Sequence, residues 1–116
     1  GDLDLTEAID QANKLYAKFI NDAPKELQPR LQLAHRALNM RQFGLALNEL
    51  RGAQQIIDAH DLSLHWQAEL HACCALFYIL QNENETARHE FIKASRLEPD
   101  NGTIAKIRQL LIEKWQ

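Results

Sequence analysis

Histidine and cysteine side chains are the residues of this chain best suited to chemistry. His71 and Cys74 are three residues apart and so share one face of a helix, with His65 and His60 upstream. Four such ligands could hold a metal ion, but the spacing lacks the paired cysteines or the His-Glu-x-x-His arrangement that makes a metal site specific. We therefore predict no metal site and no cofactor.

Nucleophilic catalysis is equally weakly indicated. A Cys–His pair needs an open, electropositive cleft, whereas His71 and Cys74 lie in a strongly apolar stretch that predicts a core helix. The adjacent Cys73 and Cys74 cannot be joined without straining the backbone, so both are expected to be free buried thiols. The four glycines are isolated, and none belongs to a phosphate-binding loop. We predict that the protein is not an enzyme.

Charge and hydropathy exclude two further classes of partner. The net charge is -3 and the isoelectric point near 5.9, whereas nucleic-acid binding needs clustered Lys and Arg. No apolar run approaches the roughly 18 residues that span a membrane, and the acidic start is unlike a signal peptide. We expect no nucleic acid and no membrane contact, a cytoplasmic location, and a place within a larger protein.

The elements that carry these residues are predicted to be helices. The 116 residues are 46% hydrophobic, with few glycines and prolines, and apolar residues recur at steps of three and four. This pattern predicts an all-α fold of about six helices near 3–20, 29–40, 43–59, 63–80, 86–97 and 102–116. Asp61 or Ser63 is a plausible N-cap for the fourth, which is apolar all round and therefore predicted to be central. Gly52 weakens the third helix or marks a close contact with a neighbouring backbone.

Small and aromatic residues repeat along these helices. Ala12 and Ala46 are 34 residues apart, and Ala46 and Ala87 are 41 apart, seven more. A larger residue at Ala34, Ala46, Ala75 or Ala87 would push two crossing helices apart. The frame resembles that of the tetratricopeptide repeat (TPR) family, whose first helix carries a small residue and an aromatic and whose second carries Ala, Phe, Ala and Pro. The best match comprises Ala75, Tyr78, Ala87, Phe91, Ala94 and Pro99.

The resemblance implies one domain over residues 1–116, built as a right-handed superhelical array of antiparallel helix pairs. Its parts would be a partial repeat at 3–24, a degenerate repeat at 27–60, a repeat with extended helices at 63–101 and a capping helix at 102–116. The family's first-helix Trp is replaced by Arg30 and His71, its aromatic by Ala37 in the earlier repeat, and the closing Pro by Asp58. The seven extra residues are expected to extend the helices on either side of residues 61–63.

In TPR proteins the first helices line a concave groove that holds a peptide. The resemblance therefore implies a groove for a peptide or helix of a partner protein, and a role as an adaptor or scaffold. Its residues here would be Gln28, Leu31, His35, Leu38, Asn39, Glu69, Ala72, Leu76 and Lys106. A core role for the apolar residues of 64–80 remains an alternative. The lysine–asparagine clamp with which some members hold a terminal carboxylate is absent. A structural or regulatory self-association domain is the alternative function.

Overall fold

The computed structural model describes residues 6–8, 11, 24–60 and 62–114. Five named helices fill most of this part: α2 (Leu27–Asn39), α3 (Phe43–Ala59), α4 (Leu64–Leu80), α5 (Asn84–Leu97) and α6 (Gly102–Lys114). Residues 6–8 and 11 are also helical, and the described residues contain no strand. The predicted all-α fold is confirmed. The partial repeat expected at 3–24, and the alanine and aromatic positions assigned to it, lie almost entirely outside the described residues.

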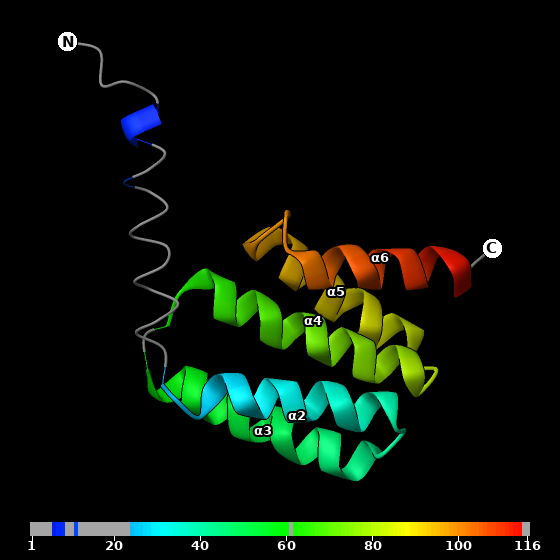
Figure 1. Cartoon of the computed structure of the whole chain (residues 1–116). Coiled ribbons are helices and arrows are strands. Elements are labelled where there is room, and N and C mark those ends of the chain that lie inside the picture. The colour runs from blue at the N-terminus through cyan, green and yellow to red at the C-terminus, as the bar shows by residue number, and fades with distance from the viewer. Residues whose placement is uncertain (1–5, 9–10, 12–23, 61, 115–116) are drawn as a thin grey trace.

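The helices form two antiparallel pairs followed by a single helix (Figure 1). Short turns join α2 to α3 and α4 to α5, and α6 follows the second pair. The first helices of the two pairs, α2 and α4, contact each other, and the single helix α6 contacts α4 in turn. Helix α3 also packs on α4. The central position predicted for α4 is confirmed, since it contacts the other four named helices.

Alanines mark the places where the helices of each pair cross. Ala34, Ala46 and Ala53 belong to one buried cluster, and Ala75, Ala87 and Ala94, each 41 residues later, belong to the second. All six are 0% exposed. A side chain limited to one methyl group lets two helix backbones approach closely, so the same small residues recur where the same crossing is built twice.

Helix α4 is buried on two sides, as its all-round apolar sequence predicted. One face carries Leu70, Cys73 and Phe77 into the cluster shared with α2 and α3. The other face contributes to the cluster shared with α5 and α6 through Ala72 and Ile79. A helix between two layers needs apolar residues around most of its circumference, which is why α4 lacks the single stripe of its neighbours.

The turns inside the two pairs have the same geometry. Arg41 and Asn82, again 41 residues apart, both adopt the left-handed conformation, with φ of 59° and 61°. In each turn the next amide bonds back to a carbonyl of the preceding helix: Gln42 N to Ala37 O at 2.8 Å and Glu83 N to Tyr78 O at 2.9 Å. This is the Schellman closure of a helix end. The second pair therefore repeats the first in its backbone as well as in its alanines.

The seven extra residues of the longer spacing lie inside helices. Helix α3 has 17 residues, three more than its counterpart α5, and α4 has 17, four more than its counterpart α2. The connection between α3 and α4 remains short, as expected. Two helices extended toward a common turn preserve the crossings made further along them.

Three details of the helix ends and interiors differ from expectation. Helix α2 begins at Leu27, so Pro29 lies in its first turn rather than at its start. Ser63 is the N-cap residue of α4, but its hydroxyl makes no capping bond. Gly52 lies close to a side chain and not to a neighbouring backbone, because a Cβ at this position would collide with the guanidinium of Arg30. Arg30 Nη1 lies 3.3 Å from Glu49 Oε2 on α3.

Candidate functional site

Two neighbouring hollows open along the side where the first helices touch. The α2–α4–α6 hollow has a volume of about 410 Å³ and is lined by His35, Asn39, Leu76, Thr103, Lys106, Ile107 and Leu110. The α2–α4 hollow has a volume of about 210 Å³ and is lined by Gln28, Leu31, Gln32, His35, His65, Trp66 and Glu69. His35 lines both, so the two form a continuous strip along α2.

Seven of the nine residues predicted to line a groove lie in these hollows: Gln28, Leu31, His35, Asn39, Glu69, Leu76 and Lys106. The other two, Leu38 and Ala72, are 0% and 1% exposed and belong to the core. Leu31 is also a core residue, since only 4% of its surface is exposed. On each helix, helical spacing places the predicted residues near one face. Where α2 and α4 pack against neighbouring helices, the residues that point directly at the neighbouring helix are buried.

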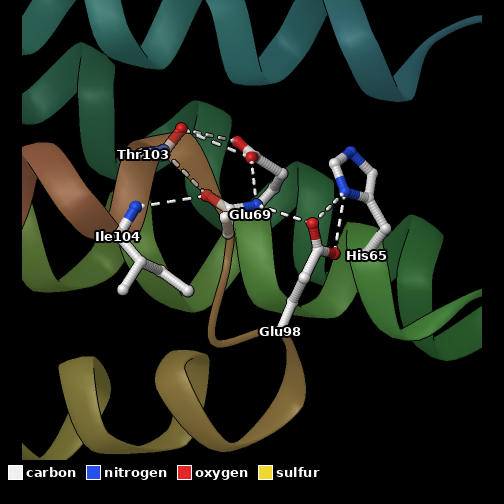
Figure 2. A network of polar contacts seen from close by, with 6 residues as sticks. His65, Glu69, Glu98, Thr103 and Ile104 are labelled. Carbon is white, nitrogen blue, oxygen red and sulfur yellow. Dashed lines mark hydrogen bonds and ion pairs between the residues drawn. The ribbon is translucent and has the colours of Figure 1, made fainter.

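A network of polar contacts joins the start of α6 to Glu69 of α4 (Figure 2). Asn101 is 3% exposed, and its Oδ1 accepts hydrogen bonds from the backbone amides of Thr103 (2.8 Å) and Ile104 (3.1 Å). This is an N-cap, which satisfies amides that have no partner inside the helix. The Nδ2 of Asn101 donates to Glu69 Oε1 at 2.7 Å, and Thr103 Oγ1 donates to Glu69 Oε2 at 3.2 Å. Glu69 is thus held in a fixed orientation.

The same network reaches the end of α5. His65 Nδ1 donates to the carboxylate of Glu98 at 2.9 Å, and Glu98 Oε1 also accepts a longer bond from Asn101 Nδ2 at 3.4 Å. The sequence analysis placed residues 98–101 between two predicted helices and did not predict this role. The signal was present, because Asn is a favoured N-cap residue and Asn101 directly precedes the helix predicted at 102–116.

A second cluster brings His35 of α2 against Cys73 of α4. Cys73 Sγ lies 3.1 Å from His35 Nε2, and ligand atoms of His35, Glu69 and Cys73 all lie within 4.8 Å of one another. Burial raises the pKa of the Cys73 thiol well above its usual value, and the charge of Glu69 adds to this. Burial lowers the pKa of His35, opposed by Glu69. The contact is therefore a hydrogen bond between a neutral thiol and a neutral imidazole.

The histidine and cysteine singled out by spacing have separate environments. His71 Nδ1 donates to Glu90 Oε2 at 2.6 Å, which joins α4 to α5. The hydrogen bond from His71 is the main cause that lowers the pKa of Glu90. Burial raises the pKa of Cys74 to about 12, so its thiol carries a proton at neutral pH. The cluster that does form depends on His35 and Glu69, which the sequence reasoning assigned to a groove and not to a metal site.

Comparisons of the chain with protein-family models, curated proteins and solved structures found no match. Among the described residues, no helix has both the length and the apolar character needed to cross a membrane.

Proposed function

We propose that this domain binds a peptide or helix of a partner protein along the strip formed by the two hollows. The observation that carries the proposal is the α2–α4–α6 hollow, to which each of these three helices contributes an exposed or half-buried side chain: Asn39, Leu76 and Lys106. Both apolar and polar groups line it, which suits an amphipathic segment with apolar anchors. Partner binding fits this geometry better than catalysis, because neither thiol of the strip's central helix is ionised at neutral pH.

The lining also indicates the chemistry of the partner. Leu110 is 41% exposed and Leu76 half-buried, so both can cover an apolar side chain of the ligand. Lys106 supplies an exposed cation beside them, whereas the carboxylate of Glu69 is already bonded to Asn101 and Thr103. An apolar segment with an acidic residue therefore complements this strip.

The test uses variants that change the strip without disturbing the core. Peptides selected from a displayed helical library on the wild-type domain are measured by fluorescence anisotropy against L110E/K106E, and against I92E as a matched control. Ile92 lies on α5 and is 38% exposed. We expect at least a tenfold loss of affinity in L110E/K106E and less than a twofold change in I92E. Leu31 is unsuitable because it is buried.

Two results would contradict the proposal. One is an equal loss of affinity in I92E and L110E/K106E, and the other is a set of amide chemical-shift changes confined to α3 and α5. Failure of any peptide to bind would count against it too.

Self-association is the second candidate, favoured by one observation. Helix α6 ends the described array with Leu110 and Ile112 41% and 47% exposed. Two copies could bury these side chains against each other. Sedimentation as a monomer at high micromolar concentration would exclude this function, whereas a dimer that I112E dissociates would support it.

A further inference from the structure

The geometry points to a zinc-binding site formed by His35, Glu69 and Cys73 at the floor of the α2–α4 hollow. Their ligand atoms all lie within 4.8 Å of one another, on two helices that pack together. Imidazole nitrogen, carboxylate oxygen and thiolate sulfur are the three ligand types that Zn²⁺ takes in proteins, and three protein ligands with one open position are typical of reactive zinc sites. The site shares His35 and Glu69 with the strip proposed for partner binding, but metal binding can be measured without any partner.

Cys73 and His35 need only a small movement to coordinate the ion. Zinc binds nitrogen at about 2.0–2.1 Å and sulfur at about 2.3 Å, so in a tetrahedral site these two ligands lie about 3.6 Å apart. Cys73 Sγ and His35 Nε2 are 3.1 Å apart, so the pair needs to open by only about half an ångström. Side-chain rotation of this size requires no change in the packing of α2 on α4.

The carboxylate of Glu69 is held in place by hydrogen bonds from the start of α6. Asn101 and Thr103 donate to its two oxygens at 2.7 and 3.2 Å, which holds it as a hydrogen-bond-accepting carboxylate. A carboxylate offers about four lone-pair positions, so these bonds leave room for a metal ion. Polar groups that fix a ligand from behind are a regular part of metal sites and raise their affinity.

The site is open on one side and closed on the other. His35 and Glu69 line the α2–α4 hollow, from which an ion and a water molecule as fourth ligand can enter, while Cys73 is fully buried beneath them. Zinc takes the place of the thiol proton, which leaves to solvent, and the sulfur binds as thiolate. The hydrogen bond between Cys73 and His35 is replaced by two bonds to the ion.

Cobalt titration tests the site, because Co²⁺ substitutes for zinc and a thiolate ligand produces charge-transfer absorption in the near ultraviolet. The chain is first freed of metal with a chelator and kept reduced. We expect saturation at one equivalent, loss of the absorption on adding Zn²⁺, and loss of it in C73S. Cys74 is the matched control: it lies on the same helix but is not part of the cluster, so C74S should retain the band. The affinity of H35Q should be at least tenfold lower.

The proposal is overturned if the wild-type chain shows no charge-transfer band at hundred-micromolar Co²⁺, or if C74S removes the band and C73S does not. A second measurement covers the case in which C73S fails to fold. Thermal unfolding of the wild-type chain should shift upward with Zn²⁺ and not with Mg²⁺, because an ion that binds only the folded state stabilises it. An unchanged unfolding temperature at hundred-micromolar Zn²⁺ would likewise refute the site.

Discussion

Replacing Asn101 tests whether this single side chain holds α6 on the rest of the array. N101A removes the N-cap bonds to the amides of Thr103 and Ile104, and loss of an Asn cap costs about 1 kcal/mol. It also removes the 2.7 Å bond to the carboxylate of Glu69. A hydrogen bond to a charged group contributes about 1.5–3 kcal/mol, and we take about 1 here because Glu69 is half-buried and keeps its bond from Thr103.

The expected destabilisation of N101A is therefore about 2 kcal/mol, which for a domain of this size lowers the unfolding temperature by about 10 °C. Two further variants separate the cap from the contact with Glu69. N101D keeps a good capping oxygen but places a carboxylate against Glu69, so like-charge repulsion replaces the hydrogen bond. The double variant N101D/E69Q restores a donor and an acceptor with their roles exchanged, and should recover at least about 1 kcal/mol of the loss.

Urea unfolding followed by far-ultraviolet circular dichroism measures all four chains, with the slope checked for two-state behaviour. The reasoning fails if N101A lies within about 0.5 kcal/mol of wild type, the range of neutral surface changes. It fails as well if N101D is as stable as wild type, because the bond to Glu69 would then contribute nothing.

Two further predictions concern the core and the strip. A87L inserts a large side chain at a helix crossing that is 0% exposed, and should lower the free energy of unfolding in urea by about 1–3 kcal/mol. A105L, at an exposed position of α6, should change it by under about 0.5 kcal/mol. Equal effects would refute close packing at Ala87. Burial lowers the pKa of His35 below 6.5; the charge of Lys106 adds to this effect and the charge of Glu69 opposes it. As the pH falls, His35 is therefore protonated in the unfolded chain before it is protonated in the folded one. Stability should therefore decline below pH 6.5, and less steeply in H35Q; parallel profiles would contradict this.

The carboxylate of Glu69 links the polar network at the start of α6 to the cluster of His35 and Cys73. It accepts bonds from Asn101 and Thr103, which position α6, and it belongs to the cluster with His35 and Cys73. Any ligand that binds Glu69 from the hollow therefore acts on the side chain that also anchors the last helix.

Local patterns in the sequence were enough to predict the helices and their pairing. The three- and four-residue spacing of apolar side chains defines a stripe within one helix. Ala34 and Ala46, like Ala75 and Ala87, are 12 residues apart, so each pair indicates where two helices joined by a short turn cross. The confirmed features are the all-α class and the central place of α4. The handedness of the array and membership of the TPR family remain predictions.

Only the tertiary structure decided which polar side chains meet. His35 and Cys73 are 38 residues apart, and Glu69 and Asn101 are 32 apart, so no spacing rule joins them. Their distances depend on how far α2 and α6 slide and rotate against α4, which is determined by the packing of the whole core. The same packing buries Leu38 and Ala72 while leaving His35 and Lys106 at the hollows. Helical periodicity assigns a residue to a face, but the neighbouring helix determines whether that face is core or site.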